Sequence, residues 1–166
     1  MFKIIDNYLD TGEFNKIKHH VESYNSFDWY LSPKANELSD DPRSFQFMHN
    51  MIWEGKPNYS EVNEYVKILL RPLNKKLRVH RCKVNLFIKQ DEPISMGFHT
   101  DYYDDNINTL LIYLEDSNGY TEFDDGDIAE SKRNRAIFFR SDKWHQTITS
   151  TDTLFRRNIN INYKIL

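Results

Sequence analysis

Apolar residues recur at three- and four-residue spacing in two segments of the N-terminal half, which is the periodicity of an amphipathic helix. In residues 11–25 the repeat consists of Phe14, Ile17, Val21 and Tyr24. The second segment begins near Ser60, a residue type that often caps a helix N-terminus. Its repeat consists of Val62, Tyr65, Leu69, Leu70, Leu73 and Leu77. Pro72 lacks an amide hydrogen and is expected to kink or interrupt this helix.

The pattern changes from Val79 onward, where short segments rich in β-branched and aromatic residues alternate with turn signals. The predicted strands are residues 81–89, 108–115, 119–123, 135–140, 145–149 and 156–165. The last of them alternates strictly, with Asn158, Asn160 and Asn162 on one face and Ile159, Ile161 and Tyr163 on the other. Its asparagine face suits the polar interior of a barrel, and its apolar face suits a packed core.

Helices followed by strands at roughly ten-residue intervals indicate an α+β fold. The order predicts a double-stranded β-helix (jelly roll) with the N-terminal helices packed on one sheet. The 166 residues are expected to form a single domain. Within it, residues 1–78 would be mainly helical support and residues 79–166 the jelly-roll core.

Charge and composition restrict the partners and the compartment. A formal net charge of −3 and an isoelectric point near 6.1 disfavour a nucleic-acid-binding surface. The basic cluster at residues 71–83 is interpreted as a solvated helix end rather than a phosphate site. Cys82 is the only cysteine, so we expect no disulfide framework and a reducing, cytoplasmic location. No signal-peptide pattern opens the chain, and no apolar run approaches the ~20 residues of a membrane span.

The stretch GFHTDYYDD, residues 97–105, contains a candidate pair of metal ligands, His99 and Asp101. Alternate residues of an extended segment point to the same side, so both side chains can face one ion. The pair alone decides little, because a His-x-Asp sequence arises often by chance in a chain of 166 residues with 6 histidines and 15 aspartates. His145, between two predicted strands, offers a third ligand. Two imidazoles and one carboxylate leave open positions, the arrangement of non-haem Fe(II) oxygenases, whereas zinc usually takes more histidine or cysteine.

Arg156 opens the last predicted strand and shares its polar face with the asparagines. A buried cation needs an anionic ligand, and a guanidinium can hold a carboxylate through two parallel hydrogen bonds. A dicarboxylic acid that chelates iron at one end would offer its other carboxylate to Arg156. The neighbouring Arg157 falls on the apolar face, and we expect it near the helices or the sheet edge, where its head reaches water.

Taken together, these residues resemble the 2-oxoglutarate- and Fe(II)-dependent dioxygenases, and within them the prolyl-4-hydroxylase-like branch. The resemblance covers residues 80–165 in the family's order and spacing, through VNLFI, FHTD, NTLLIYLED, GYTEF, AIFFRSDKWHQTI and RRNININY. By this resemblance the iron ligands would be His99, Asp101 and His145. Arg156 would hold the distal carboxylate of 2-oxoglutarate, Tyr113 would add a hydroxyl to it, and Asn85 would make a secondary contact.

Two positions depart from the family's pattern. Tyr120 follows Gly119 where members commonly have a second glycine, and Phe87 stands where tyrosine is frequent. Both departures concern the substrate side of the pocket, and neither touches the expected iron ligands.

The resemblance implies an oxygenase that consumes O2 and 2-oxoglutarate, supported by ascorbate, and hydroxylates an unactivated C–H bond. The expected substrate is a peptidyl side chain, proline first, or a small amino acid. One alternative is a nucleic-acid dealkylase on the same fold, although Asn162 replaces that branch's second arginine. Another is a cupin-like metal protein without 2-oxoglutarate, which usually presents His-x-His and has no need for Arg156. A third is a non-enzymatic binding module, which would have no reason to retain all three ligands.

Overall fold

The computed structural model describes residues 2–23, 25–36, 39 and 41–166. Its first helix, α1 (Thr11–Glu22), buries the predicted apolar repeat of Phe14, Ile17 and Val21, while Tyr24 lies outside the described residues. Asp10 caps α1, because its carboxylate accepts a hydrogen bond from the amide of Glu13 at 2.9 Å.

The second helix is shorter than its apolar repeat predicts. α2 spans Val62–Leu70, and a single 3-10 turn, η1 (Arg71–Leu73), follows it. Pro72 lies in that turn, so the predicted interruption is confirmed. The prediction that Ser60 caps the helix is wrong: its hydroxyl donates to the carboxylate of Glu61 at 2.6 Å, and α2 has no side-chain cap. No described helix is long and apolar enough to span a membrane.

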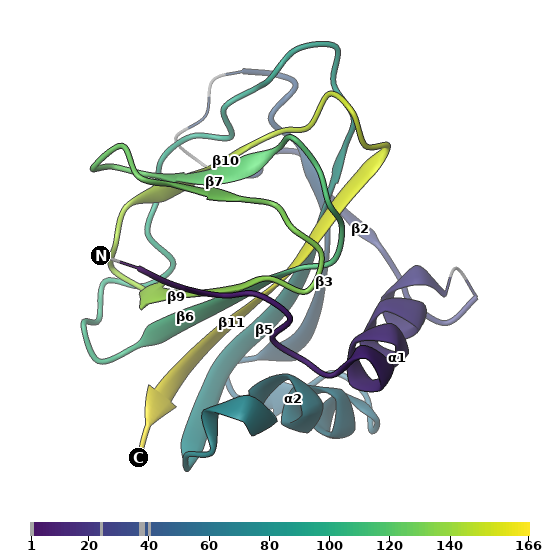
Figure 1. Cartoon of the computed structure of the whole chain (residues 1–166), viewed down its shortest axis with the longest axis vertical. Coiled ribbons are helices and arrows are strands. Elements are labelled where there is room, and N and C mark those ends of the chain that lie inside the picture. Colours follow the sequence, from purple (N-terminus) through teal and green to yellow (C-terminus); the bar gives the residue numbers. More distant parts are fainter. Residues whose placement is uncertain (1, 24, 37–38, 40) are drawn as a thin grey trace.

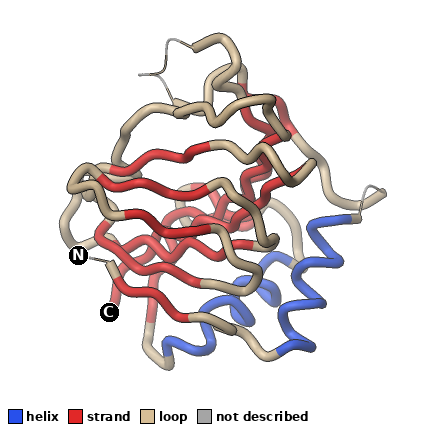
Figure 2. Tube along the Cα trace, turned by 45° about the horizontal axis from the view of Figure 1, so that its top comes forward, coloured by secondary structure: helices blue, strands red, loops and turns tan. Residues whose placement is uncertain are grey.

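The described strands form two antiparallel sheets (Figures 1 and 2). The larger sheet contains, in spatial order, β1 (Lys3–Ile5), β9 (Ala136–Arg140), β6 (Asn108–Tyr113), β11 (Phe155–Ile165), β5 (Leu77–Ile88), β3 (Gln46–Trp53) and β2 (Tyr30–Ser32). β4 (Lys56–Pro57) pairs with β3 off this path. The smaller sheet has the order β10 (His145–Ile148), β7 (Tyr120–Phe123) and β8 (Ile128–Glu130).

The main core lies between the helices and the larger sheet. Figure 1 shows α1 and α2 on one side of that sheet and the strands β7 and β10 on the other. Ile159 and Ile161 of β11 are fully buried and belong to the same apolar cluster as Val21 of α1 and Leu69 of α2. Strand alternation therefore turns the even-numbered residues of β11 toward the smaller sheet, into the space between the two sheets.

Residues 1–78 are not mainly helical support, because they also contribute strands to the larger sheet, among them β3, for which no strand was predicted. β3 pairs with β5 on one side and with β2 on the other, and β1 pairs with β9, so the larger sheet draws strands from both sides of residue 78. β3 escaped the sequence pattern because its register with β5 shifts between Asn50 and Ile52. Such an irregularity breaks the two-residue alternation by which a strand is detected.

Candidate metal centre

The even-numbered residues of β11 line the space between the sheets and are almost completely buried: Arg156, Asn158, Asn160 and Asn162. β5 presents a second polar row beside them. The register places Asn158 opposite Asn85, Asn160 opposite Lys83 and Asn162 opposite Arg81. The adjacent strands β5 and β11 thus form a polar wall on the side of the smaller sheet. The opposite face of the same two strands packs against the apolar core.

The structure brings His99, Asp101 and His145 together, with one ligand atom of each lying within 4.8 Å of the others. His99 and His145 form an isolated antiparallel bridge, in which the amide of each donates to the carbonyl of the other at 2.9 Å. The amide of Asp101 donates to the carbonyl of Ser141 at 2.9 Å. Backbone pairing therefore fixes the positions of all three side chains.

The carboxylate of Asp101 is held by side chains from three strands. It accepts hydrogen bonds from Arg81 at 2.5 Å, Thr109 at 2.9 Å, Asn160 at 3.1 Å and Asn162 at 3.0 Å. Burial raises the pKa of this carboxyl, but Arg81, the histidines and Lys83 lower it more, so the net pKa lies below its usual range. Asp101 is consequently an anion at neutral pH, with its orientation fixed.

Both histidine rings are oriented by backbone carbonyls, and His99 is in addition held neutral. Burial, and after it the neighbouring His145, lowers the pKa of His99 to about 4, so its ring is uncharged at neutral pH. Nδ1 of His145 lies 2.9 Å from the carbonyl of Lys143, and Nδ1 of His99 lies 3.3 Å from that of Gly97. An Nδ1–H that donates to a carbonyl leaves the Nε2 lone pair for a metal ion.

Arg156 has no accessible surface, and none of its three guanidinium nitrogens has a hydrogen-bond partner among the described residues. Burial lowers its pKa, with Tyr113 acting in the opposite direction, but a guanidinium remains charged in proteins. The rings of Phe87 and Tyr113 lie 5.7 and 5.4 Å from its central carbon. A buried, unpaired cation is costly unless an anion joins it, so the surroundings of Arg156 would favour an anionic ligand.

Gly119 makes room for the Arg156 side chain. A Cβ added at residue 119 would lie 2.8 Å from Cδ of Arg156 and 3.0 Å from the carbonyl oxygen of Ile148. Gly119→Ala is therefore expected to displace the guanidinium. If Arg156 holds the distal carboxylate of 2-oxoglutarate, as the sequence resemblance implies, the variant should weaken that binding by about tenfold or more, as overpacking of about 1–3 kcal/mol would.

Equilibrium titration with 2-oxoglutarate, in parallel with Mn(II) titration, measures this effect. Gly12→Ala in the first turn of α1 is the control, because its nearest neighbour would be Asp10 at 3.3 Å. Loss of Mn(II) binding together with 2-oxoglutarate binding would point to a general collapse instead of a displaced arginine.

Tyr113 and Asn85 lie on the same interior wall, with different hydrogen bonding. The hydroxyl of Tyr113 lies 2.8 Å from Thr121 Oγ1 and 3.1 Å from the carbonyl of Ala129, so its proton already has acceptors. Asn85 donates to Asn158 at 2.9 Å and leaves its own Oδ1 buried without a partner. His99, His145 and Asn85 are among the residues that line one internal cavity.

Arg157 lies on the helix side of β11, as the alternation predicts, but not at a sheet edge. β11 is paired on both sides, by β5 and β6. The guanidinium of Arg157 contacts Glu115 at 2.6 Å and Glu22 of α1 at 2.7 Å. The carboxylates of Glu115 and Glu22, rather than bulk water, therefore neutralise the charge of the Arg157 guanidinium.

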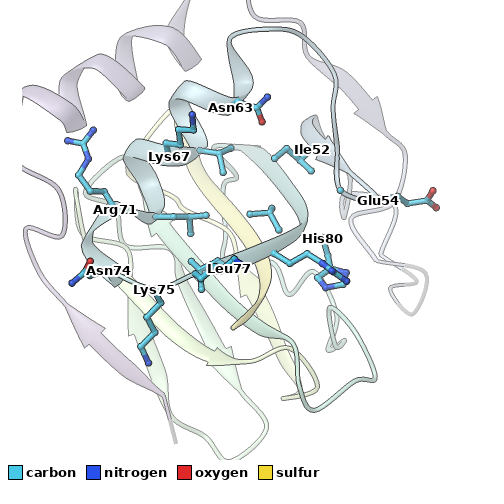
Figure 3. Close-up of a pocket in the computed structure, with 15 residues that line it drawn as sticks. Ile52, Glu54, Asn63, Lys67, Arg71, Asn74, Lys75, Leu77 and His80 are labelled. Carbon is cyan, nitrogen blue, oxygen red and sulfur yellow. The ribbon is translucent and has the colours of Figure 1, made fainter. Parts of the chain in front are cut away.

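The interpretation of residues 71–83 as a solvated helix end is wrong for its second half. Arg81 and Lys83 lie on β5 and face the interior, where Arg81 holds Asp101. The first half lines an open groove of about 1000 Å³ that includes Lys67, Arg71 and Lys75 (Figure 3). Sequence reasoning missed the interior pair because a run of cations resembles a solvated surface until its strand register is known.

No protein-family model matches the chain, and no curated protein matches it. Solved structures do match over nearly the whole chain. A 2OG-Fe(II) oxygenase family oxidoreductase from Burkholderia pseudomallei superposes with a TM-score of 0.69 at 12% identity, covering 98% of this chain and 85% of that one. A prolyl hydroxylase from Trichoplax adhaerens, in complex with a hypoxia inducible factor peptide, gives 0.68 at 16% identity, covering 99% and 83%. The chain has the fold of the 2OG-Fe(II) oxygenases.

A further similar structure is that of HygX from Streptomyces hygroscopicus, which was solved with nickel and 2-oxoglutarate bound. It superposes with a TM-score of 0.60 at 13% identity, covering 99% of this chain and 82% of that one. These neighbours support the coarser part of the predicted fold, a mostly antiparallel sheet accompanied by two helices. At these identities the neighbours establish the fold alone, and the chemistry of this chain must be argued from its own residues.

Proposed function

We propose that the protein is a 2-oxoglutarate- and Fe(II)-dependent oxygenase on a double-stranded β-helix, with His99, Asp101 and His145 as iron ligands. The donor set suits Fe(II), since it combines two imidazoles with one carboxylate and contains no cysteine. The observation that carries the proposal is Arg156, whose buried guanidinium has no hydrogen-bond partner among the residues that the structure describes. It shares its face of β11 with Asn160 and Asn162, both of which donate to Asp101. A dicarboxylate would satisfy the metal and the guanidinium at the same time.

The protein's own residues would prepare this chemistry. When bound, Fe(II) supplies the redox step in which O2 oxidises 2-oxoglutarate to succinate and CO2 and hydroxylates a C–H bond. Arg156 would bind the distal carboxylate through two parallel hydrogen bonds and so orient the co-substrate. Arg81, Asn160 and Asn162 keep the Asp101 carboxylate anionic and fixed. Apolar lining residues, among them Phe87, Met96 and Leu111, limit the water in the internal cavity.

Two rival functions fit the interior less well. A nucleic-acid dealkylase would have a second arginine at the position of Asn162. Here Asn162 donates a hydrogen bond to Asp101 and accepts one from Arg81, so its side chain supports the proposed metal centre. A cupin-like metal protein that does not use 2-oxoglutarate leaves the buried charge of Arg156 without an explanation. Hydroxylation is the simplest outcome for this site, and it remains part of the proposal.

Slow turnover without a primary substrate tests the proposal directly. The purified protein is incubated with Fe(II), ascorbate, O2 and 2-oxoglutarate, and succinate is measured over time against a reaction that contains a metal chelator. We expect metal-dependent succinate formation, because oxygenases of this kind consume some 2-oxoglutarate in uncoupled cycles. Absence of succinate, together with absence of 2-oxoglutarate binding to the Mn(II)-loaded protein, contradicts the proposal.

A further inference from the structure

A second cavity of about 250 Å³ lies beside the metal centre. Its lining includes Lys34, Arg81, Lys83, His99, Thr100 and Asp101. It shares Lys83 and His99 with the internal cavity, so the candidate metal ligands stand between the two. If 2-oxoglutarate occupies the inner cavity and reaches toward Arg156, this outer cavity is the space left for the molecule that is oxidised.

The outer cavity is poorly suited to an aliphatic ring. Ala35 is the one apolar residue among its described lining residues, and the others are polar or charged. Pockets that receive apolar groups are lined predominantly by hydrophobic and aromatic side chains. An internal prolyl residue would therefore find little surface against which to bury its ring.

The groups that this cavity leaves unsatisfied are hydrogen-bond donors. The hydroxyl of Thr100 is buried without a partner, and neither Lys34 nor Lys83 has an ion pair or hydrogen bond from its ammonium group among the described residues. Arg81 is already neutralised by Asp101. Two free ammonium groups and a hydroxyl call for a ligand that only accepts, as an ionised carboxylate does.

The charge on Lys83 persists at neutral pH. Burial, and after it the nearby Arg81, lowers the pKa of Lys83 to about 8, so most of the ammonium groups are still protonated at pH 7. Lys34 is exposed at the other side of the cavity, where it can attract an anion before the anion is desolvated.

We propose that the primary substrate presents a carboxylate to the outer cavity, where Lys83, Lys34 and Thr100 bind it beside the metal centre. This rests on the proposed function, because the cavity borders the proposed iron ligands. A cavity that binds a carboxylate favours a free amino acid, another small acid or a chain-terminal residue as the substrate. It disfavours a residue inside a peptide chain. The carboxylate would anchor the substrate so that a nearby C–H bond faces the metal.

Binding to the full-length protein loaded with Mn(II) and 2-oxoglutarate tests the proposal without turnover. The probes are free amino acids and short-chain carboxylic acids, the primary amide of each, and dipeptides with a free or an amidated C-terminus. Calorimetry should show at least one acid that binds about tenfold or more tightly than its amide, the difference expected for a charged hydrogen bond of ~1.5–3 kcal/mol. Binding of free acids identifies a small-molecule substrate, whereas binding of the free dipeptides alone identifies a chain terminus.

Lys83→Met removes the charge and keeps most of the side-chain volume, and Lys89→Met, at an exposed position just beyond β5, is the matched control. We expect Lys83→Met to reduce the preference for acid over amide by about tenfold, and Lys89→Met to keep it. Equal binding of acids and amides by the wild type overturns the proposal, even if succinate formation shows that the proposed function is right. A Lys83→Met variant that weakens 2-oxoglutarate binding more than acid binding also overturns it, because Lys83 would then serve the co-substrate.

Discussion

Arg156→Ala is expected to raise the 2-oxoglutarate concentration needed for half-maximal succinate formation by more than a hundredfold. Breaking a buried charged pair by removing one partner typically costs about 3–5 kcal/mol, which corresponds to more than a hundredfold in affinity. Here the partner left behind would be the distal carboxylate of 2-oxoglutarate. Mn(II) titration should give nearly the wild-type affinity, since Arg156 makes no contact with Asp101.

Arg157→Ala is the matched control, one residue away on the opposite face of β11. Its guanidinium contacts Glu115 and Glu22, so the variant should lose stability without a large change in the 2-oxoglutarate requirement. Thermal unfolding measured beside the titration separates these effects. The reverse ranking of the two variants would contradict the assignment of the anion site to Arg156, and a null result for both would favour a metal protein that does not use 2-oxoglutarate.

The assignment of the two arginines shows what the sequence could predict and why. β11 lies between β5 and β6, with an apolar core on one face and a polar interior on the other, so its residues 156–162 obey one alternation. Ile159 and Ile161 define the core face, and the arginine in phase with the asparagines must then face the interior. The prediction held because the strand has no irregularity before Asn162.

The parts that escaped prediction depend on pairing between distant segments. β3 carries a register shift that hides its alternation, and the basic cluster gave no sign that Arg81 and Lys83 would enter the interior. Both facts follow from register, which sequence periodicity does not contain. The apolar repeat that begins in α2 also continues to Leu73 and Leu77, although α2 ends at Leu70 and the interruption predicted at Pro72 falls in η1.

The support of the candidate metal centre was likewise invisible in the sequence. Three predicted ligands could be named from residue type and spacing, but the side chains that orient Asp101 come from β5, β6 and β11. Asn158, Asn160 and Asn162 were predicted to face the interior, but no specific function was predicted for them. The register of β11 with β5 explains the role of Asn162, because it brings Asn162 and Arg81 to the same carboxylate, that of Asp101.

His99→Ala and His145→Ala are expected to abolish metal-dependent succinate formation and to weaken Mn(II) binding by at least about a hundredfold. Removing one imidazole leaves two protein ligands, too few to hold a divalent ion against water and chelators. His19→Ala, at an exposed position on α1, is the control and should behave as the wild type. If His99→Ala and His145→Ala both keep wild-type turnover, then His99, Asp101 and His145 do not form the metal site.

Asp101→Ala should fail in a different way from the two histidine variants. Its carboxylate neutralises Arg81, whose side chain is 14% exposed, and it accepts from both Asn160 and Asn162. Loss of the carboxylate therefore removes a metal ligand and also leaves a largely buried cation unpaired, which costs about 3–5 kcal/mol of stability. Asp101→Glu keeps the charge and should recover much of the stability without restoring full turnover, because the longer side chain displaces the ligand oxygen. Thermal unfolding of the metal-free proteins distinguishes these cases: if Asp101→Ala is as stable as His145→Ala, the pairing with Arg81 contributes little and Asp101 serves the metal alone.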